Sequence, residues 1–455
     1  MRVYFIILFL FCCNNLFPQG DRFRKGEVID TIWVDKKFGE SFSFYMPKSY
    51  EPSLPTPVIF IFEPMARGRT GIDPFIATAD TYGYLLVCSN NTKNGPFEQN
   101  YPIIDRLFAK VFTSLKLDPK RVYTSGFSGG GRLASSVALK TNQIQGVVSC
   151  GAAFTVNSGG LPTTQSFSYA TIIGAQDMNY YELTFTHKYL TKTKLPYEVF
   201  TPDINHRWPT RDQILMAFDW MQLEAYKNLL LPADSAITKR IYNKYYHQAQ
   251  IEEKDKRLLA ASNEYRRILN NFKRYYQMDT IQEKLNNLEQ SKAYKSEKKK
   301  DEVLLETELA LTDELFDRFN TDINKKSYNL GWWENRIEKL KKKLESDSYM
   351  EQTMYKRLLY KLFAHGIETA NYDTSIKNIE QKMFCYDICM LIYPAYALPY
   401  IKQIENAVAL GKSDLAIDYL EKLLNTGFDE KERILKNESI KTLENMDRFK
   451  KLMTK

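Results

Sequence analysis

Gly126-Phe127-Ser128-Gly129-Gly130 separates two stretches of the chain that are typical of different secondary structures. Residues 121–125 before it predict a short buried strand, and residues 131–139 after it predict a helix. A serine on a sharp turn between a strand and a helix needs small neighbours, because that turn is strained. The turn also directs the first amides of the helix to the position where negative charge develops on a substrate. The pentapeptide therefore predicts a nucleophile at Ser128, with a glycine-rich turn without chemistry as the alternative.

The first half of the chain alternates between predicted strands and predicted helices. The strands are expected at 28–34, 41–46, 58–62, 84–88, 121–125, 145–150, 169–173 and 197–200. The helices are expected at 74–82, 101–117, 131–139, 181–190 and 211–227. The run Val58-Ile59-Phe60-Ile61-Phe62 is apolar throughout, as in a strand of a sheet that is covered on both faces. This alternation predicts an α/β fold with a mostly parallel sheet and helices on both faces.

Proline and glycine are unevenly distributed along the 455 residues. Fourteen of the 17 prolines and 16 of the 20 glycines precede residue 232, and no proline occurs between residues 233 and 393. Because these residues form turns and interrupt helices, the second half of the chain predicts long helices. We expect an α/β domain at 25–230, a charged helical connector region at 231–345 and an all-α domain at 346–455.

The all-helical half carries one pattern that suggests repeats. The segment 400–427 resembles one tetratricopeptide repeat, residues 379–400 could belong to a preceding one, and 437–452 resembles the tail that closes such arrays. A generic helical bundle explains the same small residues equally well. The stretch 284–308 is dense in Lys and Glu and predicts either a solvated helix or a mobile connector.

The N-terminus is typical of an export signal. Arg2 precedes a short apolar run at 3–12, which is too short to cross a bilayer. We expect a signal at 1–20 with cleavage near 18–20, and lipidation at Cys12-Cys13 is the alternative. The protein would then be periplasmic, extracellular or a lipid-anchored envelope protein.

Net charge and the positions of cysteine and histidine bear on three questions: nucleic-acid binding, the state of the thiols, and metal binding. The net charge of +8 is mild for this length, and lysines alternate with acids after residue 230, so we expect no nucleic-acid partner. The four cysteines beyond the signal are expected as core thiols: Cys88, Cys150, Cys385 and Cys389. No histidines or cysteines have the spacing of an open zinc site, so we expect no metal and no cofactor.

A serine nucleophile needs a base within hydrogen-bond reach and a third group that orients the base. The chain has four histidines, of which His247 and His365 lie beyond the last predicted strand. His187 falls inside a predicted helix, whereas His206 follows the strand 197–200 in a loop. Loops at the carboxyl edge of such a sheet bind ligands, so we expect His206 to be the base.

The orienting acid is expected in a loop after the strand that precedes the histidine loop. Asp177 follows the strand 169–173 and Gly174, in the position that fits this role. Asp203 is the competitor, but it lies only three residues before His206 on the same loop. We therefore predict that Asp177 fixes the imidazole tautomer and stabilises the imidazolium.

Three motifs together resemble the polyhydroxybutyrate depolymerase and feruloyl esterase group of α/β-hydrolases. They are Gly126-Phe127-Ser128-Gly129-Gly130-Gly131-Arg132, Gly174-x-x-Asp177 and His206-Arg207-Trp208-Pro209. The resemblance covers about residues 25–227 and implies a Ser128, Asp177, His206 triad that hydrolyses esters through an acyl-enzyme. Trp208-Pro209 is expected to shape the histidine loop without taking part in the chemistry.

The chain departs from that group after the third strand, where the group commonly has a His-Gly pair. The sequence here is Phe62-Glu63-Pro64-Met65-Ala66-Arg67-Gly68, and Pro64 has no amide to donate. We expect the oxyanion hole to consist of the backbone amides of Gly129 and Met65. Glu63 could replace the missing histidine structurally or repel acidic substrates.

Polar residues after the strand 84–88 are candidates for substrate contacts. The segment 89–96 is expected to line one wall of the cleft, with Asn90, Asn91 and the neighbouring Arg67 as the residues that bind substrate. A hydrogen-bonded turn is the alternative interpretation of the same segment.

The sequence thus predicts an exported serine esterase whose substrate is a small-molecule ester or an acylated carbohydrate. A serine peptidase on the same fold is one alternative. The other is a weakly active or vestigial hydrolase that binds a protein partner through its C-terminal helices.

Overall fold

Eight strands form one mixed sheet in the computed structural model, which describes residues 24–154, 166–373, 376 and 378–454. The strands are β1 (Val28–Asp35), β2 (Glu40–Tyr45), β3 (Thr56–Phe62), β4 (Leu85–Ser89), β5 (Leu117–Phe127), β6 (Gly146–Cys150), β7 (Ser168–Ile172) and β8 (Tyr197–Phe200). Their order across the sheet is β1-β2-β4-β3-β5-β6-β7-β8. The pairs β1/β2 and β2/β4 are antiparallel and all the others are parallel, so the mostly parallel sheet is confirmed.

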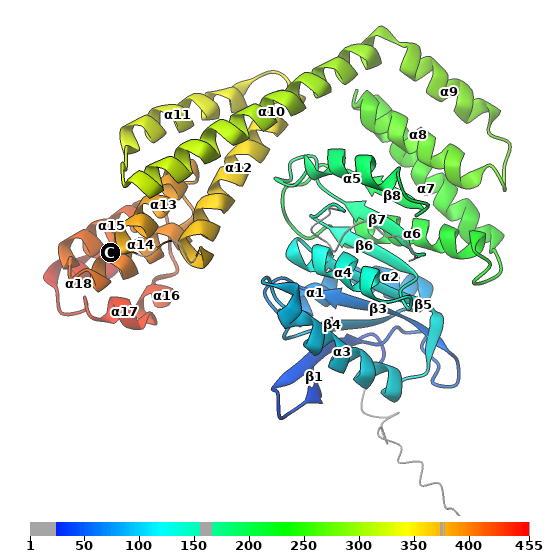
Figure 1. Ribbon diagram of the computed structural model, residues 1–455, viewed down its shortest axis with the longest axis horizontal. Helices are drawn as coiled ribbons and strands as arrows, with labels where there is room; N and C mark the ends of the chain where they lie inside the picture. Colours follow the sequence, from blue (N-terminus) through cyan, green and yellow to red (C-terminus); the bar gives the residue numbers. More distant parts are fainter. Residues whose placement is uncertain (1–23, 155–165, 374–375, 377, 455) are drawn as a thin grey trace, which may run out of the picture. The chain divides into compact units, whose positions relative to one another are not determined.

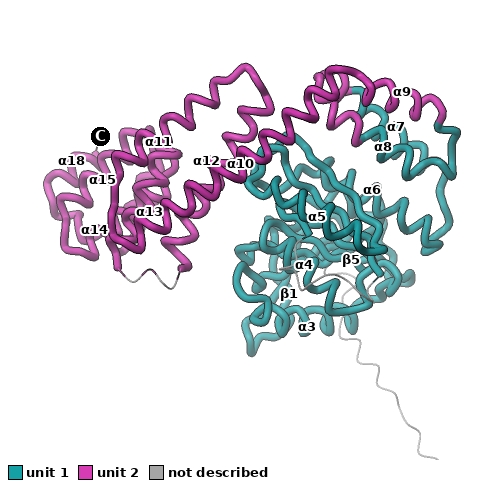
Figure 2. Tube along the Cα trace, turned by 45° about the horizontal axis from the view of Figure 1, so that its top comes forward, with its two compact units in different colours: residues 1–250, 264–278 teal, residues 251–263, 279–455 magenta. Residues whose placement is uncertain are grey.

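The described chain forms two compact units (Figure 2). The first contains residues 1–250 and 264–278, and the second contains 251–263 and 279–455. The boundary therefore falls later than residue 230, and the region 231–345 contributes helices to both units. The expected export signal lies outside the described residues.

Helices cover both faces of the sheet (Figure 1). They are α1 (Gly68–Ile72), α2 (Ile76–Tyr82), α3 (Phe97–Ser114), α4 (Gly129–Lys140), α5 (Glu182–Leu190) and α6 (Arg211–Lys227). Alternate residues of β3 pack into different cores. Val58 and Phe60 lie in the core that includes residues of α3 and α4, whereas Ile59 and Ile61 lie in the core that includes residues of α2 and α6. The apolar run of β3 is thus explained by burial on both sides.

The helix α3 begins at Phe97, not at Tyr101 as the sequence suggested, and ends at Ser114. Proline is common in the first turn of a helix, and Pro102 lies next to the expected start. In the structure Pro96 precedes the helix and Pro102 lies inside it. The earlier start places the loop 90–96 immediately before the helix.

Two more helices complete the first unit: α7 (Ser235–Lys254) and the later part of α8 (Leu258–Phe272). Asp219 of α6 is fully buried and accepts hydrogen bonds from Arg240 and Lys244 of α7, at 2.9 and 3.1 Å. Arg267 of α8 donates to the carbonyl oxygen of Val199 in β8 at 2.6 Å. These contacts attach α7 and α8 to the α/β part through buried charged groups.

The second unit is helical in the residues described. Its longer helices are α9 (Asp279–Gln290), α10 (Lys292–Lys325), α11 (Leu330–Lys342), α12 (Tyr349–Tyr372), α13 (Ile379–Ile392), α14 (Ala397–Ala409) and α15 (Ser413–Asn425). The short helices α16 (Lys431–Leu435), α17 (Glu438–Lys441) and α18 (Asp447–Thr454) follow. The Lys- and Glu-rich stretch 284–308 is helical, as part of α9 and α10. The helices α14 and α15 share buried Ala407, Ala416 and Leu420, and the resemblance to tetratricopeptide repeats stays a prediction.

The described part of the chain places all four expected core thiols in buried positions. Cys88 and Cys150 lie in β4 and β6, and Cys385 and Cys389 lie on α13. Burial raises the pKa of the Cys88 and Cys150 thiols well above its usual value. Among the helices described, none is both long enough and apolar enough to be a candidate for spanning a membrane.

Candidate active site

Ser128 occupies a strained turn between β5 and α4. Its backbone has φ 52° and ψ −121°, a positive φ that is uncommon for a residue with a side chain. The Ser128 amide donates to the carbonyl oxygen of Cys150 in β6 at 2.7 Å, which fixes the turn to the next strand. The serine is thereby held at the carboxyl end of β5, at the N-terminus of a helix.

The glycines on both sides of the serine are required by close packing. A Cβ at Gly130 would overlap the carbonyl oxygen of Phe62 in β3, and a Cβ at Gly126 would overlap the backbone of Gly130. Because these neighbours are backbone atoms, they cannot turn away as a side chain could. The sequence pattern around Ser128 is therefore the signature of a turn packed against the neighbouring strand.

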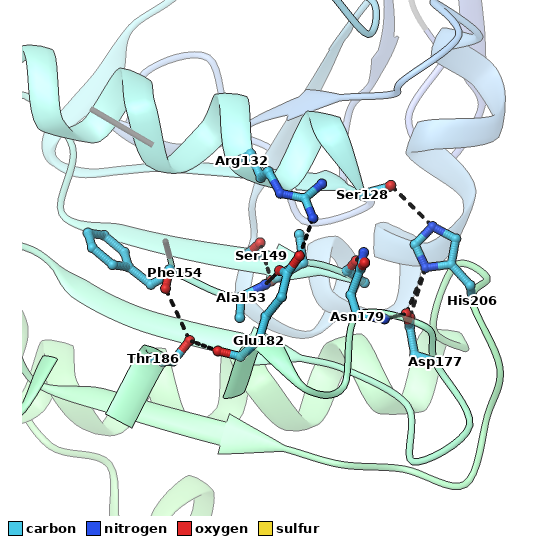
Figure 3. A network of polar contacts seen from close by, with 12 residues as sticks. Ser128, Arg132, Ser149, Ala153, Phe154, Asp177, Asn179, Glu182, Thr186 and His206 are labelled. Carbon is cyan, nitrogen blue, oxygen red and sulfur yellow. Dashed lines mark hydrogen bonds and ion pairs between the residues drawn. The ribbon is translucent and has the colours of Figure 1, made fainter. Parts of the chain in front are cut away.

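The structure brings together the three residues that the sequence singled out (Figure 3). His206 Nε2 lies 3.1 Å from Ser128 Oγ, and His206 Nδ1 lies 2.9 and 3.0 Å from the two carboxylate oxygens of Asp177. The side chains of His206 and Asp177 are 9% and 1% exposed, so the pair is shielded from water. We refer to Ser128, His206 and Asp177 as the triad.

The loops that carry His206 and Asp177 are tied to each other. The amides of Ala175 and Gln176 donate to the carbonyl oxygens of Pro202 and Ile204, at 2.8 and 3.1 Å. The Asn179 amide donates to Asp177 Oδ1 at 2.8 Å, which leaves the carboxylate oriented toward the imidazole. These bonds set the separation of acid and base through the backbone.

Three features decide the architecture. The sheet is mixed and has the strand order given above, the serine lies on a turn between a strand and a helix, and the acid and then the histidine follow it along the chain. The first unit has an α/β-hydrolase fold. Trp208 of the histidine loop packs against Phe75 and Phe127, with ring centroids 5.9 and 5.3 Å apart. The expectation that Trp208 shapes this loop agrees with these contacts.

The competing histidine and acid have other partners. His187 lies on α5, where its Nδ1 is 3.2 Å from the Tyr197 hydroxyl and burial lowers the pKa of the imidazole. Asp203 accepts from Gln176 Nε2 at 2.6 Å. His247 and His365 lie on α7 and α12.

The loop after β3 differs from the prediction at Met65. The Met65 amide donates to Glu63 Oε2 at 2.7 Å, and the Arg67 amide donates to the same oxygen at 3.0 Å. The prediction that the Met65 amide serves the oxyanion hole is therefore wrong for this arrangement, because its proton is already bound within the loop. Glu63 has a fully buried side chain and holds the loop together, in agreement with a structural role.

Asn90 and Asn91 have hydrogen-bond partners within the chain, and their predicted role in binding substrate stays a prediction. The Asn90 side chain bonds to Ser41 Oγ and to the carbonyl oxygen of Asp30, at 3.0 and 2.9 Å. Asn91 accepts from the Ser41 amide at 2.8 Å and donates to the Gly39 carbonyl oxygen at 3.1 Å. Both carboxamides thus fasten the hairpin of β1 and β2.

Arg67, the third predicted substrate contact, is engaged by the loop's own acid. Its Nε and Nη2 donate to Glu63 Oε1 at 3.1 and 2.5 Å. This pairing directs the guanidinium to Glu63, although the side chain is 54% exposed.

An ion pair that the sequence did not indicate lies on the α4 and α5 side of the triad (Figure 3). Arg132 of α4 donates to Glu182 Oε1 of α5 at 2.5 Å, and the amide of Ala153 donates to Glu182 Oε2 at 3.0 Å. The pair joins two helices and the loop after β6. No sequence signal could have found it, because the two residues are far apart in the chain and each resembles an ordinary surface charge.

Within the described residues, no group of three or more His, Cys, Asp or Glu side chains could hold a metal ion. The residues of the triad bond to one another in the order serine, histidine, aspartate. This arrangement can activate a serine hydroxyl without further groups.

No family model matches the chain, and a search of curated proteins finds no significant match. Solved structures do match. A substrate-bound, fluorophosphonate-binding serine hydrolase of Staphylococcus aureus is 15% identical and covers 44% of this chain and 99% of its own, with a TM-score of 0.37. An S-formylglutathione hydrolase of the same organism is 16% identical over 44% of this chain and 98% of its own, with a TM-score of 0.35. A feruloyl esterase module from Clostridium thermocellum is 11% identical over 42% and 85%, with a TM-score of 0.34.

Proposed function

We propose that this protein is a serine hydrolase that cleaves carboxylic esters through an acyl-enzyme. The observation that carries the proposal is the continuous hydrogen-bonded line from Ser128 through His206 to Asp177. A serine hydroxyl is a weak nucleophile unless a base accepts its proton during attack. The position of Nε2 next to Oγ supports His206 as that base.

The reaction would proceed in two balanced halves. In the first, Ser128 Oγ bonds to the ester carbonyl carbon while His206 Nε2 takes the hydroxyl proton, and the resulting imidazolium returns that proton to the leaving alkoxide. In the second, water attacks the acyl-serine, its proton passes through His206 to Ser128 Oγ, and the acid is released. Asp177 remains ionised and stabilises the imidazolium.

The expected substrate is a small-molecule ester or an acylated carbohydrate, and we include export in the proposal on the basis of residues 1–20. A fluorophosphonate probe tests the nucleophile. We expect the full chain to be labelled and Ser128→Ala to lose the label, and retention of full labelling in that variant would contradict the proposal.

A panel of short acyl esters against aminoacyl amides tests the ester specificity. We expect ester turnover to exceed amide turnover, and comparable rates on both would favour a peptidase. Inactivity of the wild type toward the whole panel, together with absence of labelling, would favour a vestigial hydrolase.

A further inference from the structure

An oxyanion hole needs donors that are free to bind the substrate. The Gly129 amide meets this condition by position, because the first amides of a helix have no partner within the helix. The Met65 amide does not, because it donates to the Glu63 carboxylate. Of the two expected donors, only the Gly129 amide keeps that role by position, so the group that would take the place of the Met65 amide has to be sought among the other described residues near Ser128.

A side chain lies next to Gly129, where such a donor would be useful. A Cβ built on Gly129 would meet three atoms first, and all of them belong to Asn94. Asn94 Oδ1 would overlap that Cβ, and Asn94 Cγ and Nδ2 would lie 2.8 and 3.4 Å from it. The Asn94 carboxamide thus occupies the space that a side chain at residue 129 would fill.

The backbone of Asn94 is held firmly in this place. Its amide donates to the carbonyl oxygen of Pro64 at 2.8 Å, and Met65 and Lys93 form an antiparallel bridge. The carboxamide of Asn100 clamps the preceding residue, accepting from the Lys93 amide at 3.1 Å and donating to the Lys93 carbonyl oxygen at 3.0 Å. The loop 90–96 is therefore fixed both to α3 and to the loop after β3.

The carboxamide of Asn94, in contrast, has no hydrogen-bond partner among the described residues and can bind a ligand. Asn94 is exposed, and within the described residues its side chain takes part in no hydrogen bond. Its two carboxamide neighbours in the segment, Asn90 and Asn91, are both bonded to the hairpin of β1 and β2. Of these three asparagines, Asn94 is the one beside Gly129, and both of its Nδ2–H groups can donate to a ligand.

We propose that Asn94 is a catalytic residue whose Nδ2–H donates to the substrate's carbonyl oxygen as that oxygen becomes negative. The inference rests on the proposed function and adds the second donor of the oxyanion hole beside the Gly129 amide. The donor is a side chain placed by α3 and the loop before it. It replaces the loop amide that Glu63 binds.

The test compares the full-length wild type with Asn94→Ala, Asn94→Asp and the control Gln99→Ala. Gln99 is an exposed carboxamide in the first turn of α3 and is not among the atoms nearest to Gly129, so Gln99→Ala removes the same chemical group without removing the contact with Gly129. The probes are p-nitrophenyl acetate, an alkyl trifluoromethyl ketone that forms a hemiketal oxyanion with serine, and the matching trifluoromethyl carbinol that cannot. Removal of one side-chain donor from an oxyanion hole typically lowers kcat by about 10²–10³-fold.

We expect Asn94→Ala to lower kcat about 100-fold and to weaken the ketone by a similar factor. KM and the affinity for the carbinol should change by less than about threefold, because the donor acts on the oxyanion only. Asn94→Asp keeps the size of the side chain but presents a negative charge, and it should be slower than Asn94→Ala. Gln99→Ala should match the wild type.

Three results would overturn the inference while leaving the proposed function intact. They are an active wild type with Asn94→Ala within about threefold of it, an equal loss of affinity for ketone and carbinol, and an Asn94→Asp variant as active as the wild type. A wild type that is neither labelled by a fluorophosphonate nor active on any ester would instead contradict the proposed function itself.

A second variant tests the contact between Asn94 and Gly129. Gly129→Ala keeps the backbone amide, but its Cβ would displace the carboxamide, so we expect a loss of kcat close to that of Asn94→Ala. In the Asn94→Ala background the same change should cost less than about threefold, because the group that it displaces is already gone. Fully additive losses would contradict the proposed contact.

Discussion

The ring of Phe127 lies beside the imidazole of His206, with ring centroids 4.7 Å apart and planes inclined by 38°. Phe127 immediately precedes Ser128 and is the last residue of β5. The residue before the nucleophile thus contacts the base directly. It limits the positions that the imidazole can adopt between Ser128 and Asp177.

Phe127→Ala should therefore reduce kcat by about 10- to 100-fold with little change in KM, because an imidazole that drifts by about 1 Å no longer aligns with Ser128. Phe127→Tyr keeps the ring and should retain most of the activity. Steady-state kinetics on a short acyl ester measure both. If Phe127→Ala changed KM alone, the ring would be a substrate contact.

Asp177→Asn should lower kcat by about 10⁴-fold, because a neutral amide neither fixes the tautomer of His206 nor stabilises the imidazolium. Asp203→Asn provides a matched control on the histidine loop. Its carboxylate bonds to Gln176, and we expect that variant to keep most of its activity. A larger loss in Asp203→Asn than in Asp177→Asn would reverse the assignment of the acid.

Glu63→Ala should destabilise the first unit by about 2–4 kcal/mol, because the amides of Met65 and Arg67 lose their acceptor in a buried loop. Arg67→Ala should cost less than about 1 kcal/mol, since the guanidinium is largely exposed. Urea unfolding of the two variants measures the difference. Equal effects would mean that the ion pair, and not the loop amides, carries the stabilisation.

The alternation of strands and helices and the chain order of Ser128, Asp177 and His206 could be predicted from the sequence. Buried strands need continuous apolar runs, and only two of the four histidines, His187 and His206, precede the last helix of the α/β part. The oxyanion loop could not be predicted, because a carboxylate that accepts from its own loop amides leaves no pattern in the sequence. Glu63 alone does not reveal whether Met65 has a free amide.

The loop after β4 shows the same limit. This strand lies between β2 and β3, so the first residues of its loop reach the β1–β2 hairpin and the later ones reach α4. The sequence places Asn90, Asn91 and Asn94 in one polar segment but cannot tell which of them faces which neighbour. Only the strand order separates the two structural asparagines from the one beside the nucleophile.

Asp387 of α13 is expected to make the stability of the second unit depend on pH. Burial raises the pKa of its carboxyl group to about 6, against hydrogen bonds from Gln403 and Tyr419 that lower it. An acid with a raised pKa in the folded state binds more protons when folded, so its contribution to stability is complete below pH 4 and declines as pH rises to about 6.

Asp387→Asn should remove that decline and stabilise the second unit by about 3 kcal/mol at pH 7.5 relative to pH 4. The measurement is the difference in free energy of unfolding between variant and wild type at the two pH values. A difference that does not vary with pH would show that the pKa of Asp387 is the same in the folded and the unfolded protein.

The contacts of Asp219 determine where the gene can be divided without destabilising the α/β part. A fragment that ends at residue 230, where the α/β pattern stops, would lack Arg240 and Lys244 and leave a fully buried carboxylate with only the hydroxyl of Tyr82. Breaking a buried ion pair in this way typically costs about 3–5 kcal/mol. A fusion made at that residue would therefore contain a destabilised α/β part. A fragment that extends to residue 278 would include Arg240, Lys244 and Arg267.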